Sequence, residues 1–210
     1  MLGAIIGDIV GSVYEWHNIK TKDFPLFRDG CFFTDDTVIT LATADALMNG
    51  GKADDFVDAY KKWGRLYPNV GYGGRFGSWI HSDDRKPYNP WGNGSAMGVS
   101  PCAWLMDCGL CARTGMWPTN SKDRARLSAE VTYNHPEGVK GALAVTDAIF
   151  MCRFYLTWPS CSINSSKIHT ALSISIDRTN HDLYNTISTF RVQNGVCVFE
   201  HPIRDIAFEA

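Results

Sequence analysis

The sequence predicts a single, mainly helical domain that spans residues 1–210. Three observations lead to this prediction. Several segments carry apolar residues at the three- and four-residue spacing of a helix that buries one face. The chain has no internal repeat and no low-complexity linker, and its 210 residues suffice for one substantial core but leave little room for two. The hydrophobic fraction of 45% and the charged fraction of 20% are those of an ordinary globular protein.

The first expected helix lies within residues 1–16. Three glycines recur every four residues there and therefore share one face: Gly3, Gly7 and Gly11. Asp8 and Glu15 are two turns apart, so they project to a common side. The segment lacks a basic leader and is shorter than the roughly 20 apolar residues of a membrane span. We therefore expect a buried helix.

Five further helices are expected from the same spacing, at residues 37–48, 54–63, 101–111, 121–131 and 139–156. Asn49-Gly50-Gly51 ends the first of them and Pro136-Glu137-Gly138 opens the last. Between residues 67 and 100 the chain is rich in Gly, Pro, Asn and Ser, which predicts a long loop of the kind that often carries function. The run Val196-Cys197-Val198-Phe199 is compatible with a short strand.

The charge and cysteine content bound the partners and the compartment. Twenty basic and 22 acidic residues give a net charge of −2, which does not indicate binding to nucleic acid or to a membrane. No stretch resembles a secretory signal, and the number of cysteines, seven, is odd. We therefore expect reduced thiols and a cytoplasmic protein.

The segment Phe33-Thr34-Asp35-Asp36-Thr37 places two adjacent carboxylates and two hydroxyls at the start of a helix. Magnesium prefers oxygen ligands of these kinds, so Thr34, Asp35 and Asp36 are candidate metal ligands. The same residues suit a helix N-terminus, where Thr and Asp act as caps and acidic side chains interact favourably with the helix dipole. The two interpretations are compatible, and both stay open.

Three further segments suggest a phosphate-bearing ligand. Gly71-Tyr72-Gly73-Gly74 is either a plain turn or a loop whose amides cradle a phosphate. The small residues of Gly92-Asn93-Gly94-Ser95-Ala96-Met97 suit a helix N-terminus that offers amides to an anion. His135 precedes a helix, where an imidazole is either structural or in contact with a ligand. Together with Asp8 and Glu15, which are costly on a close-packed face unless paired, ligating or solvated, these segments indicate a phosphate group beside a carboxylate-bound metal.

Five segments together resemble the ADP-ribosylglycohydrolase family, which is typified by dinitrogenase reductase-activating glycohydrolase. They follow the family's order and cover residues 3–15, 33–37, 71–74, 87–97 and 134–142. The resemblance implies an all-α, orthogonally packed fold around a binuclear magnesium site. It also implies hydrolysis of the glycosidic bond between ADP-ribose and a protein side chain, or cleavage of a related ADP-ribose compound. The partners implied are ADP-ribose or ADP-ribosylated protein, with no nucleic acid and no membrane.

The resemblance also assigns roles to residues of this sequence. Thr34, Asp35 and Asp36 would form the first half of the metal site. Glu15 resembles the glutamate that lies near the scissile ribose, and Glu15 and Asp36 are the candidate catalytic carboxylates. ADP-ribose would contact two glycine loops and one histidine, at Gly71, Tyr72, Gly73, Asn93, Gly94, Ser95, Ala96, Met97 and His135.

The sequence departs from the family pattern in three places. The family completes its metal site with an Asp-Ser/Thr-Asp-Thr cluster near the C-terminus, which is missing here, although residues 201–210 resemble the helix that precedes it. Gly98 stands where an arginine is common, and Tyr133 where a second histidine is common. We therefore expect a C-terminally shortened domain with an incomplete binuclear site. Alternatives are a catalytically impaired relative, which binds ADP-ribose, ADP-ribosylated protein or a protein partner without turnover, and a fragment of a longer protein.

Overall fold

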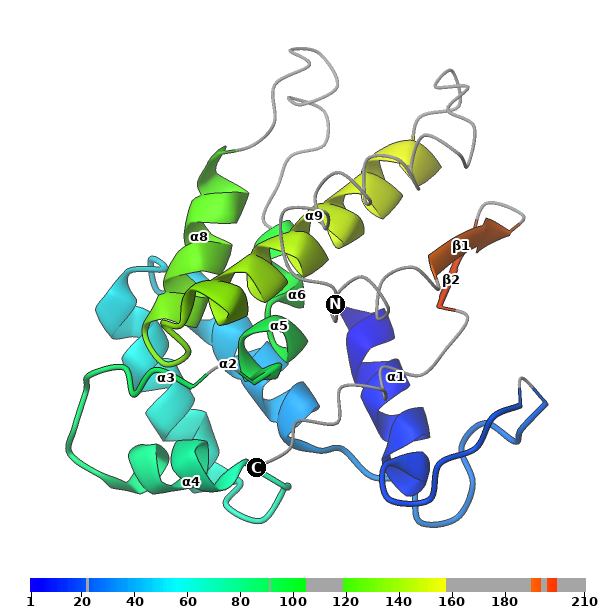
Figure 1. The fold of residues 1–210 in the computed structure, drawn as a ribbon, viewed down its shortest axis with the longest axis horizontal. Coiled ribbons are helices and arrows are strands. Elements are labelled where there is room, and N and C mark those ends of the chain that lie inside the picture. Colours follow the sequence, from blue (N-terminus) through cyan, green and yellow to red (C-terminus); the bar gives the residue numbers. More distant parts are fainter. Residues whose placement is uncertain (22, 91, 105–118, 158–189, 194–195, 200–210) are drawn as a thin grey trace.

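Helices dominate the computed structural model, which describes residues 1–210 except 22, 91, 105–118, 158–189, 194–195 and 200–210 (Figure 1). The helices are α1 (Leu2–Gly11), the 3-10 helix η1 (Ser12–Tyr14), α2 (Asp35–Met48), α3 (Ala53–Leu66), α4 (Gly74–His81), α5 (Gly94–Met97), α6 (Ser100–Trp104), α8 (Thr119–Glu130) and α9 (Pro136–Thr157). Strands β1 (Phe190–Gln193) and β2 (Val196–Phe199) pair antiparallel, with Phe190 opposite Phe199. The predicted all-α fold class is confirmed, with this strand pair as a small addition.

Most predicted helices are confirmed, with shifted ends. α2 begins at Asp35, two residues before the predicted start, and α3 extends the predicted segment 54–63 at both ends. α8 and α9 match the predictions at 121–131 and 139–156, and β2 matches the expected strand. α6 covers the first part of segment 101–111, and the remainder lies outside the described residues. Residues 201–210, which resemble the helix before the family's C-terminal metal motif, also lie outside the described residues.

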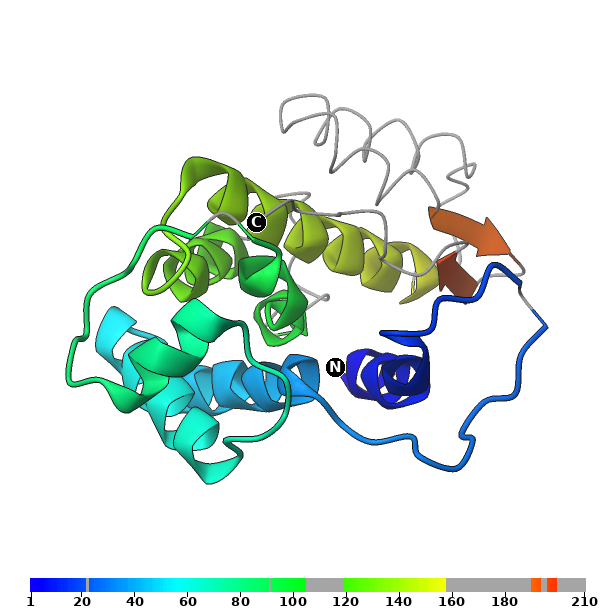
Figure 2. The same ribbon diagram turned by 60° about the horizontal axis from the view of Figure 1, so that its bottom comes forward.

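α2 is the central helix of the described part. Four consecutive residues of its first turns are buried, from Thr37 to Thr40, so the helix is covered on several sides. It packs against α1, α3, α5 and α6. α5 and α6 lie between α2 and α9, and α9 crosses the assembly obliquely (Figure 1 and Figure 2). The segments after α2 therefore bring α5 and the start of α9 to the same side of α2.

α3 packs closely against α2 through alanines and against α4 through a glycine. Ala42 and Ala46 of α2 are fully buried against α3 in the main core cluster. On the other face of α3, Gly64 adjoins Ile80 of α4, and an ideal Cβ on Gly64 would lie 2.6 Å from Cδ1 of Ile80. Lys61 of α3 also fixes α4, because its buried Nζ donates to the carbonyl oxygen of Trp79 at 2.6 Å.

α1 is a helix as predicted, but the expectation that residues 1–16 are buried is wrong. Within the described part of the chain, Val10 is the one buried residue of α1, and Leu2 is 73% exposed. Among the described residues, no atom lies within 4 Å of a Cβ built on any of its three glycines. The reason is that α1 packs mainly against η1 and one end of α2, so its glycine face meets no backbone of the described residues.

The prediction of a long loop between residues 67 and 100 is wrong in part, because α4 forms there in addition to the short helix α5. Phe76, Trp79 and Ile80 have helical spacing and are buried in the main core cluster. The glycines Gly73, Gly74 and Gly77 lower the helical propensity of this segment and obscured the signal in the sequence. Packing of the apolar face against α3 outweighs that propensity.

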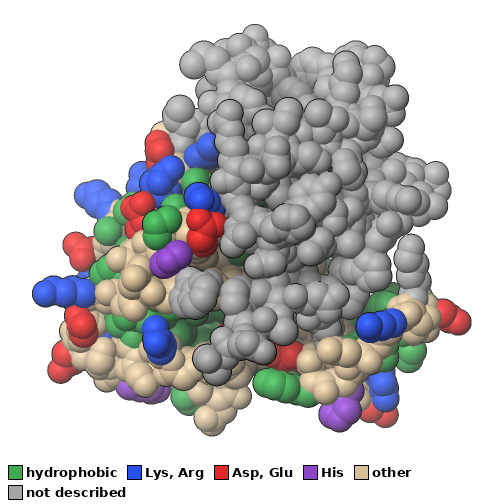
Figure 3. Space-filling model, in the orientation of Figure 1, with side chains coloured by type: hydrophobic (Ala, Val, Ile, Leu, Met, Phe, Trp, Pro, Cys, Tyr) green, Lys and Arg blue, Asp and Glu red, His purple; other side chains and the backbone are tan. Residues whose placement is uncertain are grey.

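The described surface carries mixed charge. Figure 3 shows basic and acidic side chains interspersed over the coloured part of the face in view. Arg85, for example, pairs with Asp58 at 2.6 Å and with Asp54 at 3.0 Å. None of the helices in the described part combines the length and the apolar character that crossing a membrane requires.

Replacing Gly64 with alanine should lower the free energy of unfolding by about 1–3 kcal/mol, because the added methyl group would overpack the core. Ile80 is fully buried and cannot move away easily. The same substitution at Gly77 is the control, since the nearest atom to its new Cβ would be Cβ of Tyr72 at 3.9 Å. Alanine is favoured over glycine in a helix by about 1 kcal/mol, so Gly77→Ala should be stabilising. Urea unfolding measures both changes, and equal losses at the two positions would contradict the packing argument.

Candidate functional site

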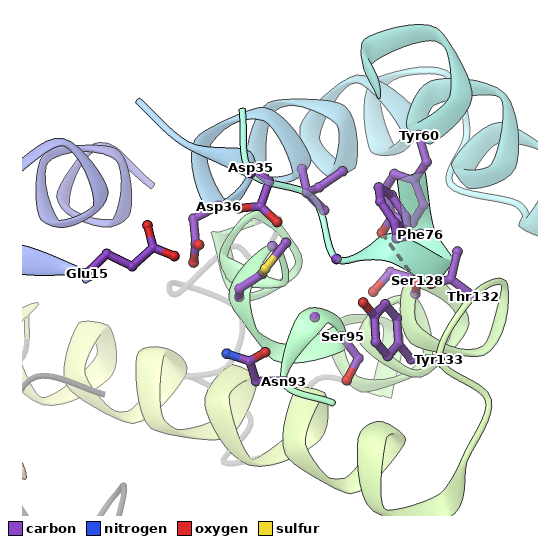
Figure 4. Close-up of a pocket in the computed structure, with 16 residues that line it drawn as sticks. Glu15, Asp35, Asp36, Tyr60, Phe76, Asn93, Ser95, Ser128, Thr132 and Tyr133 are labelled. Atoms are coloured by element: carbon purple, nitrogen blue, oxygen red, sulfur yellow. Dashed lines mark hydrogen bonds between the residues drawn. The ribbon is translucent and has the colours of Figure 1, made fainter. Parts of the chain in front are cut away.

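One pocket of about 220 Å³ opens where α2, α4, α5 and the end of α8 meet. Figure 4 shows that it has two different ends. Carboxylates gather at one end, where the Glu15 side chain extends toward Asp36, and aromatic rings and hydroxyls gather at the other. The lining residues are Glu15, Asp35, Asp36, Ile39, Tyr60, Gly71, Gly73, Phe76, Asn93, Gly94, Ser95, Met97, Gly98, Ser128, Thr132 and Tyr133.

The acidic end is built on the first turn of α2. Thr34 is the N-cap residue, and its hydroxyl accepts a hydrogen bond from the backbone N–H of Asp36 at 3.4 Å. The cap interpretation of Thr34 is therefore confirmed. Asp35 and Asp36 occupy the first turn, where acidic side chains interact favourably with the helix dipole.

Asp8 of α1 completes the cap from another helix. Its Oδ2 accepts hydrogen bonds from the backbone N–H groups of Thr34 and Thr37, at 2.8 and 3.2 Å. The two threonine hydroxyls also donate to it, Thr34 to Oδ1 and Thr37 to Oδ2, both at 2.5 Å. A carboxylate has enough lone pairs to accept all four donors. Asp8 thus joins α1 to the start of α2.

Burial and mutual repulsion make the acidic pair unfavourable as two free carboxylates. Burial raises the pKa of Asp35 to about 7, helped by the neighbouring charge of Asp36 and then by those of Glu15 and Asp8. Burial also raises the pKa of Asp36 to about 6, followed by the charges of Asp8 and Glu15. No described Lys, Arg or His forms an ion pair with either residue. The pocket therefore favours a bound cation or a proton at this end.

The donor set fits magnesium in an open, partly hydrated site. The side chains at the acidic end, Glu15, Asp35 and Asp36, offer only oxygen atoms as metal ligands. Magnesium is commonly held by one or two carboxylates together with water and phosphate oxygens. The described residues contain no group of three or more His, Cys, Asp and Glu side chains that could hold a metal ion by themselves. Asp35 and Asp36 would hold such an ion, with Thr34 as a further oxygen donor.

Two backbone loops border the acidic pair. The N–H of Asp35 donates to the carbonyl oxygen of Val70 at 3.0 Å, which holds the following Gly71 loop against the start of α2. Gly71 has a positive φ of 101°, which an L side chain rarely adopts. The second loop enters α5, where the hydroxyl of Ser95 donates to the carbonyl oxygen of Gly138 at 2.7 Å and so fixes α5 to α9.

Four residues predicted at the site do not line the pocket: Thr34, Tyr72, Ala96 and His135. Thr34 is 5% exposed. The hydroxyl of Tyr72 is buried, and no described group forms a hydrogen bond with it. His135 is half-buried, and its Nδ1 accepts a hydrogen bond from the backbone N–H of Glu137 at 3.2 Å, which caps the start of α9. The other predicted residues line the pocket together.

The sequence prediction missed the aromatic end of the pocket. Tyr60, Phe76 and Ser128 carry no motif, because their spacing is that of ordinary core residues. Tyr133 and Gly98 were visible only as departures from the family pattern. A Cβ on Gly94 would overlap the Tyr133 ring, and one on Gly98 would lie 2.5 Å from Cγ2 of Ile39.

A comparison with protein families agrees with this arrangement. The family model described as ADP-ribosylglycohydrolase matches residues 1–185, which is most of the chain. The chain therefore belongs to the ADP-ribosylglycohydrolase family. No curated protein matches the chain significantly.

Two tyrosine-to-phenylalanine substitutions should have different effects on stability. The hydroxyl of Tyr60 forms a hydrogen bond with Thr43 at 3.2 Å and donates to the carbonyl oxygen of Ser128 at 3.3 Å. Tyr60→Phe should therefore lower the free energy of unfolding by about 1 kcal/mol. Tyr72→Phe, the matched control, removes a buried hydroxyl that has no described partner, so it should leave that free energy unchanged or raise it. Denaturant unfolding without ligand measures both, and an equal loss in Tyr72→Phe would argue for an unseen partner.

Proposed function

We propose that this member of the ADP-ribosylglycohydrolase family is a magnesium-dependent hydrolase. Its substrate would be the glycosidic bond between ADP-ribose and a protein side chain, or a related ADP-ribose compound. The observation that carries the proposal is that an acidic pair without an ion-pair partner among the described residues shares one pocket with two loops that expose backbone amides.

The loops supply a place for the phosphates. The first amides of a helix have no partner inside the helix, and they attract anions through hydrogen bonds and the helix dipole. α4 starts at Gly74, directly after the pocket residue Gly73, and no side chain caps it. Asn93 is the N-cap residue of α5 and makes no side-chain cap hydrogen bond. A diphosphate between these two loops would place an attached ribose near Glu15 and the acidic pair.

The carboxylates supply the chemistry at the ribose. When bound, magnesium would orient the ribose hydroxyls and lower the pKa of a coordinated water. Glu15 is exposed and lines the pocket, so its carboxylate can contact both solvent and a substrate held there. We propose Glu15 as the principal proton acceptor, and Asp36 as a magnesium ligand that can also accept a proton.

The second candidate function is binding of ADP-ribose, or of a protein that carries it, without turnover. One observation favours it: the acidic cluster of the described part supplies too few side chains to hold two metal ions. The two candidates share the pocket and the ligand, so only a measurement of product release separates them.

Magnesium together with ADP-ribose should stabilise the protein, because a ligand that binds only the folded state shifts the unfolding equilibrium. At a free concentration of 100 times the dissociation constant the gain is about 2.7 kcal/mol. The double variant Asp35→Asn with Asp36→Asn should lose the part of the melting-temperature shift that depends on magnesium. The control is Asp83→Asn with Asp84→Asn, an exposed adjacent pair that does not line the pocket. A shift that persists in the Asp35 and Asp36 variant would rule out the ligand assignment.

Release of ADP-ribose from a modified protein should depend on Glu15. Glu15→Gln keeps the shape of the side chain but removes its capacity to accept a proton, which should slow release by about 100- to 10,000-fold. Asp29→Asn, in the exposed segment that follows, is the control. Release is measured at saturating magnesium by chromatography of the free nucleotide. Binding of ADP-ribose with no release by the wild type would favour the second candidate function.

A further inference from the structure

We propose that Asp8 is a positioning residue for the magnesium site, acting through Thr34. Its carboxylate accepts a hydrogen bond from the Thr34 hydroxyl. The lone pairs of the Thr34 oxygen are thereby left available to a cation. This inference rests on the proposed function, because it concerns how the first turn of α2 is prepared to bind magnesium.

The geometry around Asp8 separates its two carboxylate oxygens. Oδ2 accepts three hydrogen bonds, from the backbone N–H groups of Thr34 and Thr37 and from the Thr37 hydroxyl. Oδ1 accepts one, from the Thr34 hydroxyl at 2.5 Å. Oδ2 therefore holds the backbone of the helix start, while Oδ1 acts on the Thr34 side chain alone.

The direction of the Thr34 proton matters because a hydroxyl carries one proton and two lone pairs. A cation can be bound only through a lone pair. The Thr34 hydroxyl donates its proton in a hydrogen bond to Asp8. Its oxygen accepts one long hydrogen bond, from the N–H of Asp36 at 3.4 Å, and retains a second lone pair. An acceptor at Oδ1 is therefore the condition for Thr34 to serve as a metal ligand.

Asparagine at position 8 would reverse this direction. Its single amide oxygen would replace Oδ2, where three donors converge, because the opposite orientation would place an NH₂ group against all three. The NH₂ group would then face the Thr34 oxygen in place of Oδ1. The hydroxyl would then accept a hydrogen bond from the amide and could no longer donate its own proton to residue 8, so its lone pairs would be less available to a cation.

The test measures magnesium binding by calorimetry in the presence of ADP-ribose, together with the free energy of unfolding. Asp8→Asn should weaken magnesium binding by about 10- to 100-fold, as expected for partners behind the ligands of a metal. Thr37→Val is the matched control. It removes another hydroxyl donor to Asp8 and should lower stability, but it should leave the magnesium dissociation constant within about twofold, because Thr34 keeps its acceptor.

Loss of the Asp8 charge would also weaken binding, so the test needs a second step that separates charge from orientation. If Asp8 acts through Thr34, then Asp8→Asn with Thr34→Val should bind magnesium no more weakly than Thr34→Val alone. Thr34→Ser keeps the hydroxyl, so in the otherwise wild-type protein it should bind magnesium more tightly than Thr34→Val does. In the Asp8→Asn background, Thr34→Ser should give no such gain over Thr34→Val.

Three results would overturn the inference or its premise. Additive losses in the double variant would mean that Asp8 acts through charge alone. Unchanged magnesium binding by Asp8→Asn, with only a loss of stability, would make Asp8 a purely structural cap. Absence of magnesium binding by the wild-type protein would instead remove the proposed function itself, and with it the role assigned to Asp8.

Discussion

The site depends on the junction between Asp8 and the start of α2. α1 buries little of its own surface in the described part of the chain, so this group of four hydrogen bonds is its principal polar attachment. The junction fixes two things together. It holds the first turn that carries Asp35 and Asp36, and it fixes the end of α1, from which η1 leads to Glu15. Carboxylates from two separate segments thereby meet in one pocket.

The same arrangement places negative charges close together where water is partly excluded. Glu15 and Asp8 both raise the pKa values of Asp35 and Asp36, in addition to the effect of burial. Such repulsion destabilises the folded state when no ligand is bound, and it favours binding of a cation. The acidic turn therefore lowers the stability of the ligand-free protein and raises its affinity for a cation. The threonine hydroxyls of the junction are neutral, which lets them support the acidic turn without neutralising it.

The sequence revealed the acidic end of the site but not its aromatic end. Thr34, Asp35 and the glycine loops form contiguous motifs, and such motifs are readable because their geometry is set by local backbone structure. Tyr60 and Ser128 reach the pocket only through the packing of α3 and α8, which no local pattern encodes. The burial of α1 was misjudged for a similar reason: a glycine stripe permits close approach but does not supply the partner.

Two of the three departures from the family pattern, Gly98 and Tyr133, are accommodated by their neighbours. Gly98 lies against Ile39 so closely that a larger side chain could not occupy position 98 without displacing a buried residue of the central helix. Tyr133 fills the space beside Gly94 in the same manner. With Gly98 in place of an arginine, none of the described residues that line the pocket carries a cationic side chain. Among the described residues, a phosphate bound there would contact the amides of the α4 and α5 loops and the cation that we propose at the start of α2. If that proposal is right, loss of the cation should weaken binding of the phosphate ligand as well.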